Sequence, residues 1–522
     1  MTQNSEHSDD TPAHVGLHAA HTPNRAAIIM AETGQRVTFA QYEALSNRCA
    51  HLARSLGLKR GDNMAVFMPN HPWYLPLVWG GMRAGLRVTT IATHLAAAEV
   101  DHILADCGAR MLIGAASRAE ILGEVRMAGV PAAARLMLDG REHESLGFHD
   151  LEAALHEQPD TPIADQSEGV EMLYSSGTTG VPKGIRKPLP DQPFGHPNPA
   201  HRRIMAMYGI DRTSVYLSPA PLYHAAPLSF NLRAHRFGAT TVIMQRFDPQ
   251  LALQCIERHR VTHSQWVPTM FVRMLRLPQA IRERYDLSSH CCAIHAAAPC
   301  PREVKHAMID WWGPIVREYY GGSEGNGMTA LDSHQWLTHP GSVGRAIVGE
   351  IRICDERGSV LPPHRTGTVY FANGNPFEYH NDPAKTAASR HPQGWTTLGD
   401  IGHVDEDGYL YLTDRHAHVI ISGGVNIYPQ EAENRLLTHP KVMDAAVIGV
   451  PDEEFGEAVK AVVQPLNPSD AGDELARELI DYCRGAMSHV KCPRSVDFVD
   501  SLPRQENGKL YKRLLRERYW PR

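Results

Sequence analysis

Residues 174–184 read Tyr-Ser-Ser-Gly-Thr-Thr-Gly-Val-Pro-Lys-Gly, a composition that predicts a ligand-binding loop and not part of a hydrophobic core. The glycines allow tight turns and a close approach of the backbone to a ligand. Exposed backbone N–H groups can form an anion-binding concavity, the hydroxyl groups add donors, and Lys183 adds a positive charge. The stretch therefore predicts a loop that binds a polyphosphate. The G-x-x-x-x-G-K-[ST] order of the Walker A loop is absent.

An apolar-rich run, Val-Glu-Met-Leu-Tyr at 170–174, directly precedes the loop. A flexible Gly/Ser/Thr surface loop is the alternative interpretation of such a composition. The length of the stretch and its place after the apolar run favour the phosphate-binding interpretation.

Strand-like and helix-like segments alternate along the N-terminal part of the chain. Residues 63–68 form an apolar run bounded by Gly61 and Asn70, which predicts a buried strand. The alternation favours parallel sheets covered by helices, and it recurs between Ser214 and Tyr320. The other expected elements are helices over 42–56, 73–85 and 99–107 and a strand over 87–91.

The pattern changes after Gly341. Short alternating strands with Gly, Pro and Asp turns over 341–414, with a hairpin signal at 405–408, predict a smaller β unit. A compact α+β segment follows Arg415. We therefore expect an α/β fold with a large N-terminal domain, in which helices cover parallel-rich sheets, and a small C-terminal domain. The expected divisions are a disordered tail over 1–13, an N-terminal domain over 14–415 and a C-terminal domain over 416–522. The expected C-terminal elements are helices over 430–437 and 473–487 and strands over 442–450, 459–465 and 495–499.

The composition is that of an ordinary globular protein and excludes several functional classes. The chain has 522 residues, 43% hydrophobic and 21% charged, with a net charge of −6. No basic field is present to bind nucleic acid. No apolar run approaches the ~20 residues that a membrane-spanning helix needs, and peripheral membrane contact is left open. Nine cysteines without a C-x-x-C pair, and an N-terminus without an apolar signal core, favour a reduced, cytoplasmic protein. The thirty histidines show no zinc-ligand spacing, and the oligomeric state is left open.

The loop at 174–184 closely resembles the phosphate-binding loop of the adenylate-forming superfamily, which includes acyl-CoA synthetases, luciferases and peptide-synthetase adenylation domains. The resemblance extends from about Val15 to Leu515 and is closest to acyl-CoA synthetases of the fatty-acid–CoA ligase type. Further motifs occur in the family order: Pro221-Leu222-Tyr223-His224-Ala225-Ala226-Pro227, Tyr320-Gly321-Gly322-Ser323-Glu324, Leu398-Gly399-Asp400, Asp414-Arg415, Gly423-Gly424-Val425-Asn426-Ile427-Tyr428-Pro429 and Asn507-Gly508-Lys509.

The resemblance implies an AMP-forming acid–thiol ligase that uses ATP, Mg²⁺ and coenzyme A. A carboxylate is a poor acylating agent, so ATP converts its leaving group to AMP before a thiol takes the acyl group. Glu324, together with Thr179, would hold Mg²⁺, because one carboxylate plus phosphate oxygens is a usual magnesium arrangement. A solvated surface acid is the alternative for Glu324. The implied phosphate-binding residues are Ser175, Ser176, Gly177, Thr178, Thr179, Gly180 and Lys183, of which Thr178 would also take part in catalysis.

The adenosine site is implied in the same way. Tyr320 would stack on the purine, Asp400 would accept the ribose hydroxyls, and Arg415 would donate to ribose or phosphate. A core tyrosine and a turn aspartate are the alternatives for the first two. The family usually has glycine near Ala296, so this sequence departs from the pattern there. The remaining implied nucleotide contacts are Ala297, Ala298, Pro299, Glu318, Tyr319, Gly321, Gly322, Ser323 and Leu412.

Catalysis is implied to divide between the two domains. Lys509 would bridge the acyl carboxylate and the α-phosphate, offsetting the negative charge that builds there. His224 would position the substrate and gate the thiol route, and a packed or exposed histidine is its alternative. Ser422, Gly423 and Gly424 would border the coenzyme A tunnel after a rotation of the mobile C-terminal domain. The position that normally carries a hinge Asp or Lys is Ala417, which puts the usual hinge charge in doubt.

The acyl pocket is expected to include His224, Phe230, Trp266, Gly322 and Gly327. Glycines at 321, 322, 325 and 327 suggest room for a medium- or long-chain, or otherwise bulky, apolar acid. One alternative is a ligase that transfers the acyl group to a carrier protein. Another, from a different class, is a non-catalytic nucleotide-binding regulatory module.

Overall fold

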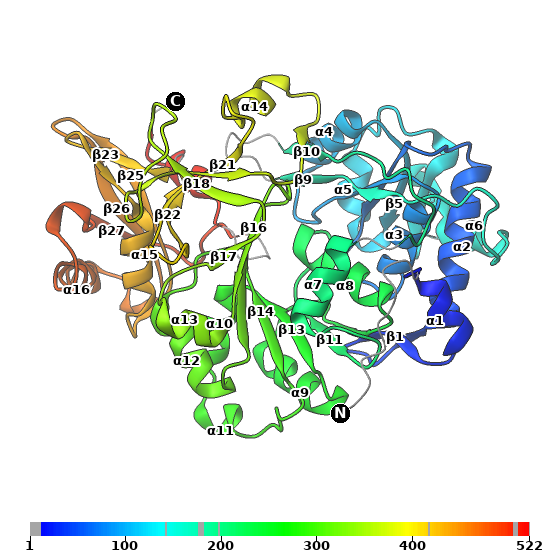
Figure 1. The fold of residues 1–522 in the computed structure, drawn as a ribbon, viewed down its shortest axis with the longest axis horizontal. Coiled ribbons are helices and arrows are strands. Elements are labelled where there is room, and N and C mark those ends of the chain that lie inside the picture. The colour runs from blue at the N-terminus through cyan, green and yellow to red at the C-terminus, as the bar shows by residue number, and fades with distance from the viewer. Residues whose placement is uncertain are drawn as a thin grey trace. The chain divides into compact units, whose positions relative to one another are not determined.

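The computed structural model describes residues 12–140, 144–175, 182–196, 199–415, 418–504 and 510–520, without the side chains of Glu144, Ser175 and Arg415. The chain forms two compact units. Unit 1 comprises residues up to Gln265 with Pro278–Ala293 and Phe377–Pro383, and unit 2 comprises Trp266–Leu277, Ile294–Pro376 and Ala384–Arg522. Figure 1 shows their elements.

A parallel sheet in unit 1 has the strand order β7-β6-β5-β3-β4-β8. Its central strand is buried on both faces, because Met64 and Val66 belong to one hydrophobic cluster while Ala65 and Phe67 belong to another. This explains the uninterrupted apolar run, which is typical of a covered parallel strand. The strands are β3 (Asn63–Phe67), β4 (Arg87–Thr90), β5 (Ala109–Ala115), β6 (Arg135–Leu138), β7 (His149–Asp150) and β8 (Val170–Glu171).

Helices lie beside this sheet (Figure 1) and confirm the predicted alternation. The helix expected from Tyr42 begins three residues earlier, because Thr38 and Gln41 form a capping box. The helices are α2 (Phe39–Ser55), α3 (Tyr74–Arg83), α4 (Ala97–Cys107), α5 (Ala119–Glu124) and α6 (Leu151–His156).

The rest of unit 1 contains strands in the order β13-β11-β12-β1-β2, parallel except for the edge pair β1–β2. A separate antiparallel set, β20-β10-β9, carries the predicted phosphate loop. The strands are β1 (Ala26–Met30), β2 (Arg36–Thr38), β9 (Leu173–Ser175), β10 (Lys183–Arg186), β11 (Val215–Ser218), β12 (Thr240–Ile243), β13 (His263–Trp266) and β20 (Glu378–Tyr379). The helices are α1 (Val15–His21), α7 (Pro199–Tyr208), α8 (Ala225–Arg236), α9 (Pro249–His259) and α11 (Gln279–Arg282).

Unit 2 contains the predicted β unit as an antiparallel sheet with the order β18-β19-β21-β22. Before it, β15, β16 and β17 pair antiparallel, with Tyr320 opposite Thr329. The strands are β14 (Cys292–His295), whose first two residues belong to unit 1, β15 (Val316–Tyr320), β16 (Met328–Leu331), β17 (Arg345–Val348), β18 (Glu350–Cys354), β19 (Gly367–Ala372), β21 (Thr396–Val404) and β22 (Leu410–Arg415). The helices are α10 (Pro268–Leu275), α12 (Arg302–Trp312), α13 (Ser333–Thr338) and α14 (Pro383–Ala388).

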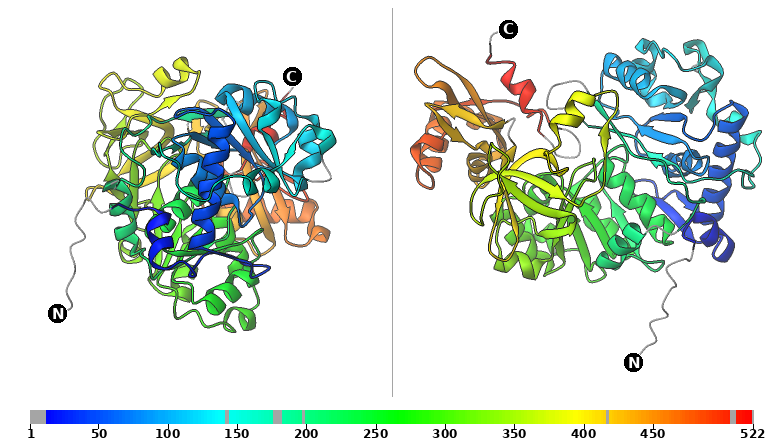
Figure 2. Two further views of the ribbon diagram at one scale, coloured as in Figure 1. Left: turned by 90° about the vertical axis from the view of Figure 1, so that its right-hand side faces the viewer. Right: turned by 45° about the horizontal axis from the view of Figure 1, so that its top comes forward.

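The C-terminal segment of unit 2 is the predicted α+β arrangement, coloured orange to red in Figure 2. Its sheet has the order β24-β23-β26-β25, and β27 pairs parallel to β26. Helices α15 and α16 pack over the apolar side chains of β25 and β26. The elements are β23 (Ile420–Ser422), β24 (Val425–Ile427), α15 (Pro429–Leu437), β25 (Val442–Asp452), β26 (Gly456–Pro465), α16 (Asp473–Arg484), β27 (Ser495–Phe498) and α17 (Lys512–Arg516).

Candidate active site

The predicted phosphate loop is flanked by paired strands. Ser175 at the end of β9 lies opposite Lys183 at the start of β10, and Tyr174 lies opposite Gly184. This pairing fixes both ends of the glycine-rich stretch. Five of its predicted ligands, Ser176, Gly177, Thr178, Thr179 and Gly180, lie outside the described residues.

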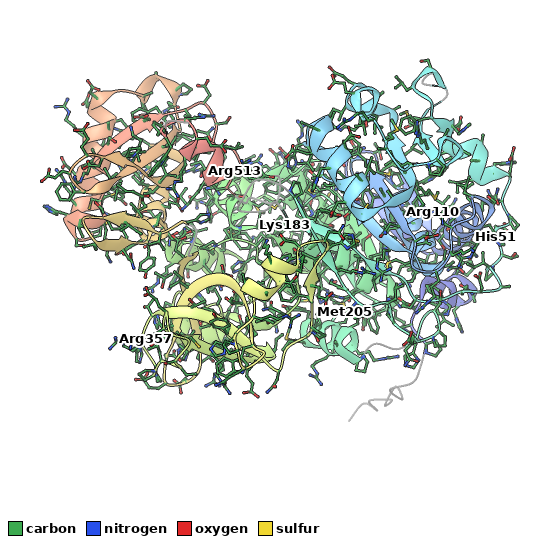
Figure 3. The ribbon with its side chains drawn as sticks, turned by 90° about the horizontal axis from the view of Figure 1, so that it is seen from above. His51, Arg110, Lys183, Met205, Arg357 and Arg513 are labelled. Carbon is green, nitrogen blue, oxygen red and sulfur yellow. The ribbon has the colours of Figure 1, made fainter. Side chains whose placement is uncertain are left out.

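Lys183 has a partner that the sequence did not reveal. Its Nζ atom lies 2.5 Å from Asp382 Oδ2, and the two side chains are 21% and 26% exposed. Figure 3 labels this lysine. Asp382 follows β20, which pairs with β10, so the sheet brings the two residues together across 199 positions of sequence. The ion pair orients the lysine at the edge of the phosphate loop.

The predicted adenine segment begins where β14 ends at His295. Ala297 has a φ of 78°, in the left-handed region. A side chain is strained there because its Cβ atom crowds the backbone. The strained residue is therefore Ala297, the neighbour of Ala296, near which the resemblance implies a glycine.

The ring and the carboxylate assigned to adenosine lie together in unit 2. Tyr320 donates its phenolic hydrogen to Asp400 Oδ2 at 2.5 Å, and its ring lies at 27° to Phe371, with 6.2 Å between centroids. Asp400 is 4% exposed and lies opposite Arg415 across β21 and β22. Leu412 pairs with Gly402 in the same ladder. Three predicted nucleotide contacts, Asp400, Leu412 and Arg415, thus come from the paired strands β21 and β22, and the hydrogen bond from Tyr320 joins β15 to them.

The glycines after Tyr320 are closely packed. A Cβ atom at Gly322 would lie 2.3 Å from Leu398 Cδ1 and 2.7 Å from Glu324 Oε2. At Gly327 it would lie 2.1 Å from the Phe371 ring. The side chains of Leu398 and Phe371 fill the space beside Gly322 and Gly327, so these two glycines do not supply the open space that the sequence suggested. Gly325, at a φ of 68°, has no neighbouring heavy atom of the described residues within 4 Å of such a Cβ position.

Glu324 is half-buried beside Gly322 and Ser323, at a turn closed by a hydrogen bond from Gly325 N to Gly322 O of 3.0 Å. No cluster of three His, Cys, Asp or Glu side chains suited to a metal ion occurs within the described ranges. A single carboxylate completed by phosphate oxygens is nevertheless a common Mg²⁺ arrangement. The carboxylate of Glu324 is of the type that could hold Mg²⁺ with phosphate oxygens, and this role stays a prediction.

Two of the predicted acyl-pocket residues lie in unit 1. His224 directly precedes α8 and is half-buried, with its ring 4.5 Å from that of Tyr223 between centroids. Phe230 lies further along α8. It is buried, and its ring contacts the rings of Tyr208 and Tyr216. The helix thus begins at the half-buried histidine and carries the phenylalanine into the core.

Trp266 belongs to unit 2 and is 1% exposed. Its ring contacts Phe271 and Trp312, with centroid distances of 6.2 and 5.5 Å. This packing makes Trp266 part of an aromatic cluster beneath the surface, which supports the segment from β13 into α10.

The predicted coenzyme A loop is the tight hairpin between β23 and β24. Gly423 and Gly424 have φ values of 57° and 79°, which glycine adopts without strain. Gly423 N donates to Phe455 O at 2.8 Å, and Ser422 is 4% exposed. The hairpin is therefore fixed at its base.

The predicted adenylation lysine, Lys509, and the expected hinge position, Ala417, lie outside the described residues. Arg504 and Leu510, which flank the lysine segment, form an isolated antiparallel bridge. Arg504 also pairs with Asp444 of β25, with Nε–Oδ2 at 2.5 Å. The ends of the lysine segment are thus anchored to the C-terminal sheet.

Glu318, predicted to lie near the adenine, forms an ion pair with Lys305, which the sequence did not single out. Its Oε2 atom lies 2.5 Å from Nζ of Lys305, and their side chains are 6% and 1% exposed. Burial raises the pKa of Glu318, and the adjacent ammonium group opposes that rise. A lysine inside α12 with polar neighbours in the sequence gives no signal of such a buried pairing.

Comparison with known proteins decides the family. Residues 17–378 match the model of AMP-binding enzymes, and residues 431–509 match that of the AMP-binding enzyme C-terminal domain. The chain belongs to the AMP-binding enzyme family. It is an adenylate-forming ligase of the acyl-CoA synthetase type, an AMP-forming acid–thiol ligase. Enzymes of this type use ATP with Mg²⁺ and coenzyme A.

Relatives of this AMP-binding enzyme match along nearly its whole length. The long-chain-fatty-acid–CoA ligase FadD13 of Mycobacterium tuberculosis is 31% identical over 503 residues, covering 96% of this chain and 97% of that one. A feruloyl-CoA synthase of an Amycolatopsis species is 34% identical over 486 residues, covering 92% and 94%. The o-succinylbenzoate CoA synthetase of Bacillus subtilis, solved with its acyl-adenylate intermediate, has a TM-score of 0.77 at 28% identity and covers 97% and 98%.

The shared fold confirms the predicted class, mixed α/β with parallel-rich sheets and a β-rich C-terminal part. None of the helices in the described ranges combines the length and the apolar character needed to cross a membrane.

Proposed function

We propose that this enzyme activates a medium- or long-chain, or otherwise bulky, apolar carboxylic acid and transfers it to coenzyme A. The observation that carries the proposal is the Tyr320–Asp400 pair. The tyrosine hydroxyl lies 2.5 Å from Oδ2 of the buried carboxylate, at the place where the family motifs put adenosine. The names of two relatives, which specify a long-chain fatty acid and a feruloyl group, support a bulky acyl group.

In the first half-reaction, a carboxylate oxygen attacks the α-phosphorus of ATP. The bond to the pyrophosphate oxygen breaks, and pyrophosphate leaves. Lys183 and the loop from Ser175 to Gly180 bind the β- and γ-phosphates, while Asp400 accepts hydrogen bonds from the ribose hydroxyls. Glu324 and Thr179 would hold Mg²⁺, whose charge would offset that of the phosphates. Lys509 stabilises the charge at the α-phosphate, and His224 orients the carboxylate.

In the second half-reaction, the thiol sulfur of coenzyme A attacks the acyl carbon. The acyl–phosphate bond breaks, AMP leaves, and the thiol proton passes to solvent. Ser422, Gly423 and Gly424 border the route of the thiol. We propose that residues 416–522 act as a mobile domain over a body formed by residues 14–415, exchanging Lys509 for this hairpin between the two steps. No disulfide bond joins any of the nine cysteines, all of which lie in the described ranges, which supports a reducing, cytoplasmic setting.

A panel of acids tests the substrate class. Purified enzyme with ATP, Mg²⁺ and coenzyme A is given acetate, octanoate, palmitate or ferulate, and the thioester is detected by mass. We expect kcat/KM to be highest for one of the three larger acids. A preference for acetate would contradict the proposal. Replacing coenzyme A with a holo-carrier protein in a parallel reaction tests the acceptor, and faster acyl transfer to the carrier would overturn coenzyme A as the partner.

A further inference from the structure

A charged pair is sealed beneath the predicted adenine segments of unit 2. Lys305 of α12 extends its Nζ atom to 2.5 Å from Oε2 of Glu318 in β15, and the two side chains are 1% and 6% exposed. The ring of Trp336 lies 5.0 Å from the same ammonium group. Neither charge can touch a nucleotide directly without a rearrangement of the core.

A third polar side chain meets this pair. His295, the last residue of β14, is 0% exposed, and its Nε2 atom lies 3.6 Å from the same Glu318 oxygen. Neither ring nitrogen has a hydrogen-bond partner among the described residues, and Phe271 packs against the ring. Burial lowers the pKa of His295, so the ring is neutral and serves as a polar neighbour of the ion pair.

The location of these three residues is informative. Glu318 stands two residues before Tyr320 in β15, and His295 stands two residues before the strained Ala297 after β14. The cluster therefore lies where both predicted adenine-binding segments leave their strands. Lys305 connects that point to α12, the helix that follows the segment at 297–299.

Stability does not account for an ion pair at this position. Removing two charges from water is costly, and replacing a buried pair by apolar side chains of similar volume is often neutral or stabilising. The pair instead fixes geometry, because a short charge-assisted hydrogen bond sets the relative position of the two segments that carry its partners.

We propose that Lys305 and Glu318, with His295 beside them, are positioning residues for ATP. The pair ties α12, the helix that follows residues 297–299, to β15, the strand that ends at Tyr320, so that these residues and the Tyr320 ring form the adenine slot. This inference rests on the proposed function, in which those segments bind adenine. Lys305 and Glu318 act through the backbone that they anchor.

The test compares stability with nucleotide affinity. Lys305→Met and Glu318→Met are made singly and together, and Tm and the ATP dissociation constant are measured by calorimetry. Each single variant should lose stability, because it leaves one buried charge unpaired. The double variant should regain most of the wild-type Tm and still bind ATP about tenfold or more weakly, since small misplacements of binding groups cost up to about a hundredfold. A double variant with wild-type Tm and wild-type ATP affinity would overturn the proposal.

A conservative variant covers the case in which the double variant does not fold. Glu318→Gln keeps the shape and an oxygen acceptor, and we expect a several-fold rise in KM for ATP with no change in KM for the acid. An unchanged KM for ATP would contradict a positioning role.

The matched control is the ion pair between Arg83 of α3 and Glu43 of α2 in unit 1, whose side chains are 0% and 16% exposed. Arg83→Met with Glu43→Met should leave ATP affinity at the wild-type value whatever its Tm. An equal loss of ATP affinity in this control would show a general effect of core disruption and would overturn the inference.

Failure of the proposed function is distinguishable, because ATP binding needs no acid. A wild-type enzyme that binds ATP but uses none of the acids overturns only the substrate class. A wild-type enzyme that does not bind ATP overturns the adenine site and this inference with it.

Discussion

The Tyr320 hydroxyl donates to the Asp400 carboxylate at 2.5 Å, so the residue assigned to adenine and the residue assigned to ribose are directly coupled. Asp400 is 4% exposed, and a buried carboxylate is costly to leave without donors. Under the proposed function the tyrosine would therefore have two separable roles, a ring that stacks on the purine and a hydroxyl that donates to the carboxylate.

Substituting Tyr320 separates these functions. Tyr320→Phe keeps the ring and removes one hydrogen bond to a carboxylate, so we expect the free energy of unfolding to fall by about 1.5–3 kcal/mol and KM for ATP to rise by less than about fivefold. Tyr320→Ala also removes the ring and should raise KM for ATP much further. Urea denaturation and steady-state kinetics measure the two effects. Equal ATP affinity in the Phe and Ala variants would show that the ring does not contact the nucleotide.

Ala297→Gly should relieve backbone strain. A non-glycine residue at a φ of 78° is disfavoured by about 1–2 kcal/mol, part of which is offset by the greater flexibility of glycine in the unfolded chain. We expect the free energy of unfolding to rise by about 0.5–1 kcal/mol in urea denaturation. Ala298→Gly is the control, because Ala298 is not in the left-handed region, and it should destabilise the protein. If Ala297→Gly and Ala298→Gly both lowered the free energy of unfolding, the result would contradict backbone strain at Ala297.

Gly322→Ala should impair the enzyme through Glu324. The added methyl group would lie 2.7 Å from Glu324 Oε2 and 2.3 Å from Leu398 Cδ1, and such overpacking costs about 1–3 kcal/mol. We expect a higher Mg²⁺ concentration at half-maximal rate and a similar loss for octanoate and palmitate. Adding Leu398→Ala should restore part of the activity by making room. A loss confined to palmitate would instead place Gly322 in the acyl tunnel, as its sequence position first suggested.

Lys509→Ala should separate the two half-reactions. A cation oriented toward the α-phosphate contributes ~3–4 kcal/mol to the transition state, or roughly a hundred- to a thousandfold in rate. Pyrophosphate release from ATP and acid should fall by that factor. AMP release from synthetic acyl-AMP and coenzyme A should persist, because that step uses the Gly423–Gly424 hairpin. Lys491→Ala is the control, since Lys491 forms an exposed ion pair with Glu431 in the same segment. An equal fall in both half-reactions would assign Lys509 a structural role and direct attention to Ala417.

The sequence predicted the features that depend on local pattern. The run at 63–68 appears as β3, a parallel strand covered on both faces, and the run at 442–450 appears as the first part of β25. The apolar spacing predicts a helix from Tyr42, whereas the Thr38–Gln41 capping box starts the helix three residues earlier, at Phe39.

The site features that were not predicted depend on contacts between distant segments. Lys183 and Asp382 meet only because β20 pairs with β10. The glycines at 322 and 327 suggested space, but Leu398 and Phe371 from the β unit fill it. The Lys305–Glu318 pair is hidden because a lysine in an amphipathic helix is normally exposed.

The central claim is that the acid passes through an acyl-adenylate. The most direct measurement uses a carboxylate labelled with oxygen-18 in the presence of ATP, Mg²⁺ and coenzyme A, followed by mass analysis of the products. Attack of the carboxylate on the α-phosphorus leaves one labelled oxygen on AMP after thioester formation. The account predicts labelled AMP, unlabelled pyrophosphate and the acyl-CoA thioester. Formation of ADP with the label in inorganic phosphate would contradict it.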